Sequence, residues 1–249
     1  MIQRIFRSEA DLANLSNRRV VLPTEKDTFD YRGLVVNKPW GYEYLSFENK
    51  HVAIWTLHLK KDFATSLHCH PQKRTSLIVL SGTVVVSGLV DKFVLKEKDA
   101  LTIESSVFHS TKALTDDVIL MEIETPPNKS DLVRLKDEYG RQNKGYEGVT
   151  DMSRELEKYN YHFFDHEHFK DVSVVGQKKM NNLNLYVKRT PHVSQFEELH
   201  QHHENLVCLL EELPGKEFAV GDITMTGKLV EKFRSNQAIP SGLLLLLII

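Results

Sequence analysis

The chain has little cysteine, no long apolar run and no excess of charge. Cys69 and Cys208 are its only cysteines, too few for a disulfide framework or a four-cysteine zinc site. The formal net charge is -2 over 249 residues, which gives no basic surface of the kind that nucleic acids require. The longest apolar run, Leu243–Ile249, is far shorter than the ~20 residues that span a bilayer. The first residues, Met1–Glu9, lack the apolar core of a secretory signal.

These absences define the setting in which the protein is expected to act. We predict a cytoplasmic protein, because its low cysteine content suits a reducing compartment. We expect no nucleic acid and no membrane among its partners. The hydrophobic content of 41% and the charged content of 27% are ordinary for a globular protein. The apolar segment 243–249 is therefore interpreted as a buried final strand or an interface strand.

Short apolar and β-branched runs, separated by turns, fill the chain between Gly33 and Glu124. Runs of this length at this spacing predict an all-β sandwich or barrel. The segment shows no alternation of strands with helices, which disfavours a parallel α/β sheet. A shorter β-like stretch follows Asn182, and its Gly221-Asp222 turn is similar to the Lys98-Asp99 turn of the first stretch. This similarity indicates two related barrels of unequal completeness.

We therefore predict four segments. They are an N-terminal arm at 1–32 with a short helix near Glu9–Leu15, a first barrel at 33–130, a charged and partly helical linker at 131–174, and a degenerate second barrel at 175–249. Within the linker, helical texture is expected around Met152–Tyr159.

Three histidines carry the strongest chemical signal. His68 and His70 are two residues apart next to an expected strand, so both imidazoles are directed to the same face. His109 follows 39 residues later, where a distant strand could bring it to the same place. Imidazole nitrogens at this spacing predict a site for one divalent transition metal.

Three sequence segments resemble a known family. They are Lys38–Glu43, which contains Pro-Trp-Gly, the His68–Thr83 metal segment, and Asp131–Arg141, which is rich in charged residues and ends in Tyr-Gly-Arg. Together they resemble the cupin superfamily, and within it the cupin domain of type II mannose-6-phosphate isomerases, over about residues 33–148. The resemblance implies a double-stranded β-helix, or jelly-roll, barrel. With the second stretch, the fold class is predicted to be an all-β bicupin whose barrels are joined by the linker.

The resemblance also implies an activity. It indicates a metal-dependent sugar-phosphate isomerase in carbohydrate metabolism, with an anionic sugar as its small-molecule substrate. Arg134 and Arg141 match the arginines of the family and are expected to bind the substrate phosphate through paired hydrogen bonds. Glu122 and Glu124 are two residues apart and share one strand face. If that face is the barrel interior, they are the candidate catalytic bases.

Two departures from the family pattern leave alternatives open. Thr75 stands where the family has a metal-binding glutamate, and Ser105–Phe108 replaces the proline-glycine turn before His109. Three neutral imidazoles suit Zn²⁺, Fe²⁺, Ni²⁺ or Co²⁺ better than Mg²⁺ or Ca²⁺. The missing carboxylate fits a three-histidine Fe²⁺ dioxygenase better than an isomerase. A non-catalytic cupin that binds sugars or other small molecules is the third interpretation, and the sequence leaves open whether the protein is an enzyme.

The second stretch and the end of the chain bear on metal binding and on assembly. His200, His202 and His203 are not followed by any later histidine, so a second metal site is not expected. Cupin barrels often pair through apolar sheet faces, and the apolar segment 243–249 would bury well in such an interface. We therefore expect a homodimer.

Overall fold

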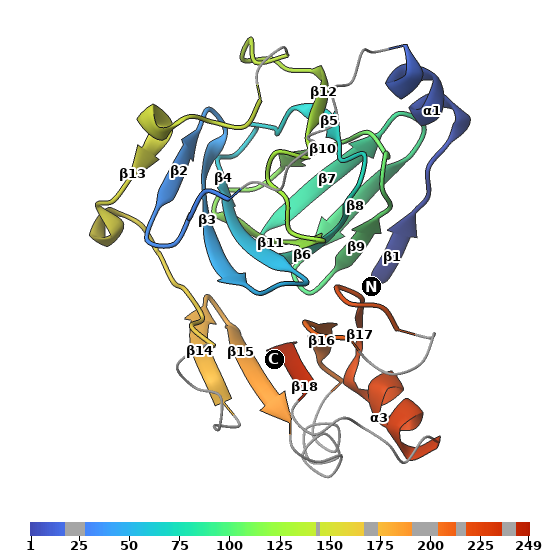
Figure 1. The fold of residues 1–249 in the computed structure, drawn as a ribbon, viewed down its shortest axis with the longest axis vertical. Coiled ribbons are helices and arrows are strands. Elements are labelled where there is room, and N and C mark those ends of the chain that lie inside the picture. The colour runs from blue at the N-terminus through green and yellow to red at the C-terminus, as the bar shows by residue number, and fades with distance from the viewer. Residues whose placement is uncertain (18–27, 143–144, 167–173, 191–203, 213–217, 236–242) are drawn as a thin grey trace. The chain divides into compact units, whose positions relative to one another are not determined.

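The computed structural model describes residues 1–17, 28–142, 145–166, 174–190, 204–212, 218–235 and 243–249. Contacts divide the chain into two compact units, Met1–Phe163 and Phe164–Ile249. Strands dominate both units (Figure 1), which confirms the predicted all-β class.

The larger sheet of the first unit has eight strands in the order β1-β9-β6-β11-β4-β3-β2-β13. These strands are β1 (Ile2–Ile5), β2 (Val35–Lys38), β3 (Gly41–Glu48), β4 (Ala53–Leu59), β6 (Arg74–Ser81), β9 (Ala100–Ile103), β11 (Val118–Thr125) and β13 (Met152–Ser153). Strands β1 and β9 are parallel, and the other neighbouring pairs are antiparallel.

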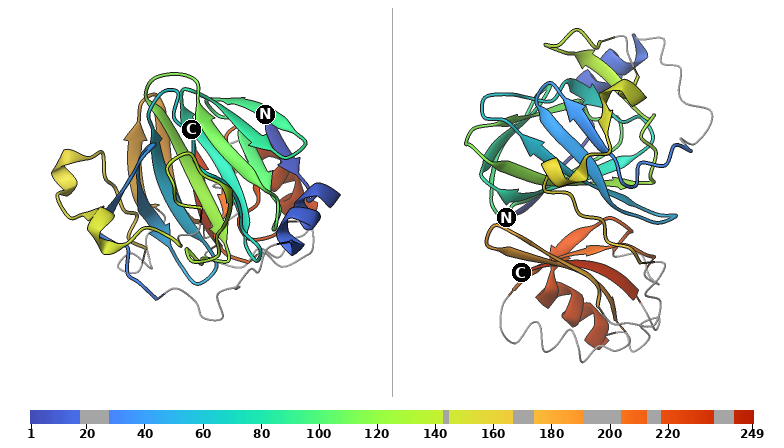
Figure 2. Two further views of the ribbon diagram at one scale, coloured as in Figure 1. Left: turned by 90° about the horizontal axis from the view of Figure 1, so that it is seen from above. Right: turned by 90° about the vertical axis from the view of Figure 1, so that its left-hand side faces the viewer.

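A second sheet of five strands faces the first in the order β12-β5-β10-β7-β8. It consists of β5 (Leu67–Cys69), β7 (Thr83–Gly88), β8 (Lys92–Lys96), β10 (His109–Ala113) and β12 (Val133–Lys136). One buried cluster joins the two sheets, with Leu77 and Leu120 from the larger and Val84 and Val86 from the smaller. The strands wrap round this common interior (Figure 2), and the unit is a double-stranded β-helix of the cupin type.

The alternation along β11 decides what this strand presents to the interior. Val118 and Leu120 belong to the buried cluster between the sheets. Because side chains alternate along a strand, Glu122 and Glu124 lie on that same face. Both are buried, and Glu122 is paired in register with Leu77 of β6. The two glutamates therefore lie on the face of β11 that points into the barrel interior, which the sequence alone does not decide.

The N-terminal segment is tied to the barrel. Helix α1 (Glu9–Ser16), predicted near Glu9–Leu15, begins after Ser8 with a capping box formed by Ser8 and Asp11. The other oxygen of the Asp11 carboxylate accepts a hydrogen bond of 2.9 Å from the Phe108 amide. This bond anchors the helix next to His109, and β1 adds a strand to the larger sheet.

Residues 131–163, predicted as part of a linker, belong instead to the first unit. They contribute β12 and β13 to the two sheets. The helix expected around Met152–Tyr159 is replaced by β13 and by two short 3₁₀ helices, η1 (Val149–Asp151) and η2 (Leu156–Lys158). Contacts with the barrel override helix propensity here, because β13 pairs with β2 and the Tyr44 hydroxyl donates to the Asn160 carbonyl.

In the second unit, the described residues form one five-stranded sheet in the order β14-β15-β18-β16-β17. The elements are β14 (Val174–Met180), β15 (Leu183–Thr190), β16 (Leu206–Leu209), β17 (Ile223–Met225), the helix α3 (Thr226–Ser235) and β18 (Leu243–Ile248). A barrel needs two facing sheets, and the described residues of this unit contain one. They do not support the expected second barrel, and His200, His202 and His203 lie outside them.

Strand β18 is the apolar segment near the end of the chain. It lies in the middle of the sheet between β15 and β16, and all six of its residues are buried. The interpretation as a buried final strand is confirmed. Because β18 is paired on both sides, it gives no support to the expected homodimer, which stays a prediction. None of the helices in the described part of the chain has the length and apolar character needed to cross a membrane.

Candidate metal centre

The fold brings together the three histidines singled out in the sequence. His68 lies on β5, His70 directly follows that strand, and His109 begins β10 opposite His68. One potential ligand atom from each of them lies within 4.8 Å of the others. This cluster could hold a metal ion, as the spacing predicts.

Hydrogen bonds to the backbone orient each imidazole. The Nδ1 atom of His68 is 2.7 Å from the Ser66 carbonyl, that of His70 is 2.6 Å from the Asp131 carbonyl, and that of His109 is 3.0 Å from the Val107 carbonyl. A carbonyl only accepts, so each Nδ1 carries the proton and each Nε2 retains a lone pair. The Nε2 atom of His70 is buried without a hydrogen-bond partner in the described structure. Metal-binding histidines are oriented in this way, so the three residues fit a metal ion.

Burial keeps these imidazoles neutral. It lowers the pKa of His109 to about 4, with the Lys73 ammonium adding to the effect. It also lowers the pKa values of His68 and His70 well below the usual range for histidine. At neutral pH the three rings therefore offer lone pairs without first losing a proton.

A cavity of about 450 Å³ lies beside the histidines. His68 and His70 line it, together with five cationic side chains and three carboxylates. The cations are Lys38, Lys73, Lys129, Arg134 and Arg141, and the carboxylates are Glu43, Glu122 and Glu124. Cations outnumber carboxylates in the lining, so the cavity is suited to an anionic ligand.

Lys129 is the centre of a buried ion-pair network that sequence reasoning missed. Its Nζ atom lies 3.2 Å from Glu124 Oε1, 3.3 Å from Glu43 Oε1 and 3.7 Å from the centre of the Trp55 ring. Lys73, whose Nζ is 2.8 Å from Glu124 Oε1, extends the network. Lysine is rarely buried unless paired, and the partners of Lys129 lie on β3 and β11, so no local pattern indicates its burial.

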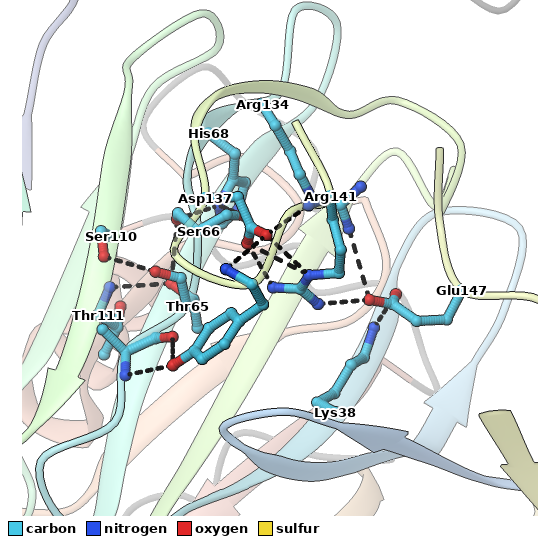
Figure 3. A network of polar contacts seen from close by, with 12 residues as sticks. Lys38, Thr65, Ser66, His68, Ser110, Thr111, Arg134, Asp137, Arg141 and Glu147 are labelled. Carbon is cyan, nitrogen blue, oxygen red and sulfur yellow. Dashed lines mark hydrogen bonds and ion pairs between the residues drawn. The ribbon is translucent and has the colours of Figure 1, made fainter. Parts of the chain in front are cut away.

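Arg134 and Arg141 line the same cavity, and both already contact carboxylates (Figure 3). Arg141 pairs with Asp137 at 2.7 Å and with Glu147 at 2.6 Å. Arg134 lies 3.5 Å from Glu147 and is opposite His68 in the pairing of β12 with β5. The structure thus places both arginines at the cavity, where they also contact Asp137, Glu147 and the Gly145 carbonyl.

The two interior glutamates differ in their surroundings. Burial alone would raise the pKa of Glu124, but the Lys129 and Lys73 ammoniums outweigh it and lower that pKa. Glu124 Oε2 has no hydrogen-bond partner among the described residues. Burial raises the pKa of Glu122 to about 7, and Glu122 Oε1 lies 3.9 Å from His70 Nε2.

Two departures from the family pattern have structural counterparts. Thr75 is buried opposite Glu124 in the pairing of β6 with β11, so no carboxylate enters the interior from position 75. In the turn before His109, Ser106 adopts a positive φ of 66°, a conformation that favours glycine. Its amide donates to the His70 carbonyl over 2.7 Å, so this turn is held without the proline and glycine of the family pattern.

Acid should destabilise the protein through Glu43. Burial raises the pKa of this carboxyl, but the Lys129 and Lys38 ammoniums and the Tyr146 hydroxyl outweigh it and hold the pKa at about 2. The unfolded chain therefore binds the proton first, and the stabilisation from Glu43 is present above pH 4.5 and lost as pH falls from 4.5 towards 2. At 1.36 kcal/mol per unit of pKa shift, this loss is about 3 kcal/mol.

Urea unfolding at pH values from 2 to 7 measures this effect. The Glu43→Gln variant should be less stable than the wild type at neutral pH, and the difference should shrink as pH falls through this range. A constant difference between the two proteins would show that Glu43 does not titrate as described.

No family model matches the chain, and no curated protein matches it. Among solved structures, a protein with a double-stranded β-helix domain from Klebsiella pneumoniae is 14% identical with a TM-score of 0.35, over 48% of this chain and 99% of that one. An RmlC-like cupin from Shewanella frigidimarina is 19% identical with a TM-score of 0.33, over 42% and 86%. KdgF from a Halomonas species is 14% identical with a TM-score of 0.34, over 42% and 89%. These likenesses concern the fold alone and carry no information about activity.

Proposed function

We propose that the first unit binds a divalent transition metal through His68, His70 and His109 and acts on a small anionic sugar as a sugar-phosphate isomerase. The observation that carries this proposal is the shared cavity, which joins oriented neutral imidazoles, an excess of cationic side chains and a partly unpaired carboxylate. No single one of these features distinguishes an enzyme from a binding protein, but their combination matches the needs of sugar isomerisation.

The donor set defines the metal and its contribution. Three neutral imidazoles suit Zn²⁺, Fe²⁺, Ni²⁺ or Co²⁺. A metal bound there would supply Lewis-acid polarisation of sugar oxygens. The residues of the chain would supply the remaining functions, which are proton transfer and recognition of the anionic group.

Glu124 is the better placed of the two glutamates for proton transfer. Its Oε1 atom forms ion pairs with Lys73 and Lys129, and these two contacts fix the carboxylate in place. Its Oε2 atom has no partner among the described residues, so a lone pair is available for a proton from a sugar carbon. The two lysines keep the group ionised, because they lower its pKa.

The anionic group of the sugar would lie beside Arg134 and Arg141, which both line the cavity. The Arg141 guanidinium carries five N–H donors, of which the contacts with Asp137 and Glu147 use only some. Its remaining N–H groups could donate to a phosphate in paired geometry, and Arg134 would add its positive charge.

Solvent exchange at the sugar C2 position tests the isomerase proposal. The metal-loaded protein is incubated with hexose phosphates in deuterated water, and deuterium at C2 is followed by NMR. We expect exchange with the wild type and a loss of about 10²- to 10⁴-fold in the Glu124→Gln variant, the range for removal of a general base.

Other outcomes would select another function. Absence of exchange with every hexose phosphate, at full metal occupancy, would contradict the isomerase. Oxygen consumption by the iron-loaded protein would favour the dioxygenase instead. Tight binding of an anionic sugar without any reaction would favour a non-catalytic binding protein.

A further inference from the structure

Glu122 is a buried carboxylate without a cationic partner. It lines the cavity and is 9% exposed. Three neighbouring carboxylates, the buried Glu43 and Glu124 and the half-buried Glu147, each lie within ion-pair distance of a lysine or an arginine. Among the described residues, the one group within such distance of Glu122 is His70, whose Nε2 lies 3.9 Å from Glu122 Oε1. A buried charge without a contacting ion-pair partner is costly, and the more distant Lys129 and Lys73 ammoniums offset the effect of burial on Glu122 only in part.

A metal ion bound by the three histidines would need a negative charge beside it. Their rings are neutral, and the cationic side chains of Lys73 and Arg134 line the same cavity. A metal dication held only by neutral nitrogens would be repelled by these neighbouring cations. A carboxylate in contact with the metal would offset that repulsion.

The geometry points to the same pairing. The 3.9 Å between His70 Nε2 and Glu122 Oε1 places this carboxylate beside the histidine cluster, whose own ligand atoms lie within 4.8 Å of one another. His70 Nε2 is buried and has no hydrogen-bond partner in the described structure. The two atoms therefore lie next to each other, and neither has a shorter polar contact with another described residue.

We propose that Glu122 is the fourth, anionic ligand of the metal, contributed by β11 and facing the strands that carry the histidines. The inference rests on the proposed metal binding by His68, His70 and His109. It assigns Glu122 a role in metal binding and leaves proton transfer to Glu124. The resulting set of three nitrogens and one carboxylate oxygen carries one negative charge and suits Zn²⁺, Fe²⁺ or Co²⁺.

Metal titration of matched variants tests this assignment. Metal-free wild type, Glu122→Gln and Glu124→Gln are titrated with Co²⁺ and with Zn²⁺ against a competing chelator. Glu124 is the control, because it lies on the same strand and face and is paired with lysines. We expect Glu122→Gln to bind at least about 10- to 100-fold more weakly, as for other groups that support a metal site. It should also change the visible Co²⁺ spectrum, whereas Glu124→Gln should keep both the affinity and the spectrum.

Thermal melting separates a ligand from a structural residue. Without metal, Glu122→Gln should melt no lower than the wild type, because it removes an unpartnered buried charge. Glu124→Gln should melt lower, because Lys73 and Lys129 lose their partner. With metal, the rise in melting temperature should shrink only in Glu122→Gln, since stabilisation follows affinity.

The outcomes distinguish this inference from the proposed function. Equal Co²⁺ affinity and an unchanged spectrum in Glu122→Gln, with the wild type binding metal, would overturn the role of Glu122 and leave the three-histidine site intact. Failure of the wild type to bind either metal would overturn the proposed function, and this inference with it. A lower melting temperature of metal-free Glu122→Gln, with metal affinity retained, would show a purely structural role.

Discussion

Loss of bound metal is the expected result of replacing His70 with alanine. The substitution removes one of three converging nitrogen ligands and leaves the Asp131 carbonyl without its imidazole donor. The remaining His68 and His109, together with Glu122, form an incomplete ligand set, so the metal should bind far more weakly and be lost during purification. Metal content of the purified variant, measured by inductively coupled plasma mass spectrometry, should fall from about one ion per chain, the content predicted for the wild type, to near zero.

Two further proteins make this measurement decisive. The His68→Ala/His109→Ala double variant should lose metal in the same way. The His51→Ala variant is the matched control, because His51 lies in the turn between β3 and β4 and is not among the residues of the cluster. Unchanged metal content in His70→Ala would contradict the site.

A severe loss of stability is expected from Lys129→Met. The methionine keeps much of the side-chain volume but removes the charge that Glu43 and Glu124 share. Both carboxylates are buried, and removing one partner from a buried ion pair typically costs about 3–5 kcal/mol. The loss of the contact with the Trp55 ring adds to the effect. The free energy of unfolding, measured in urea at pH 7, should fall by about this amount.

Lys61→Met provides the comparison. Lys61 pairs with Asp116, but both side chains are exposed, at 49% and 76%. Exposed pairs contribute about 0–1 kcal/mol, so this variant should unfold almost like the wild type. If Lys129→Met were no less stable than Lys61→Met, the buried network would not be an important source of stability.

The metal-site histidines could be recognised from the sequence because their pattern is local. His68 and His70 share a face by strand alternation alone, and a histidine in a later strand completes the cluster. The pairing of Glu122 with Glu124 on one face follows from the same alternation. Which face they share depends on how β11 pairs with β4 and β6, and that pairing joins residues at least 38 positions apart. No local pattern in the sequence therefore shows which face of β11 points into the interior.

The buried cations could not be predicted, because lysine and arginine are normally solvated. Lys38 is buried through Glu43 and Glu147, the second of which is 109 residues away. The same kind of long-range contact explains why residues 131–163, predicted as part of a charged linker, belong to the first unit. Arg141, which lines the cavity, pairs with Glu147. A charged segment that finds buried partners of opposite sign becomes part of the domain.

The backbone partners of the three imidazoles have a consequence for how this site tolerates mutation. Ser66, Val107 and Asp131 orient the rings with their carbonyl oxygens, and every amino acid carries that group. Exchange of the Ser66 or Val107 side chain therefore keeps the acceptor, provided that the local backbone is unchanged. Neighbouring positions can then diverge during evolution while the orientation of the rings persists. Sequence conservation around such a site would understate how strictly its shape is preserved.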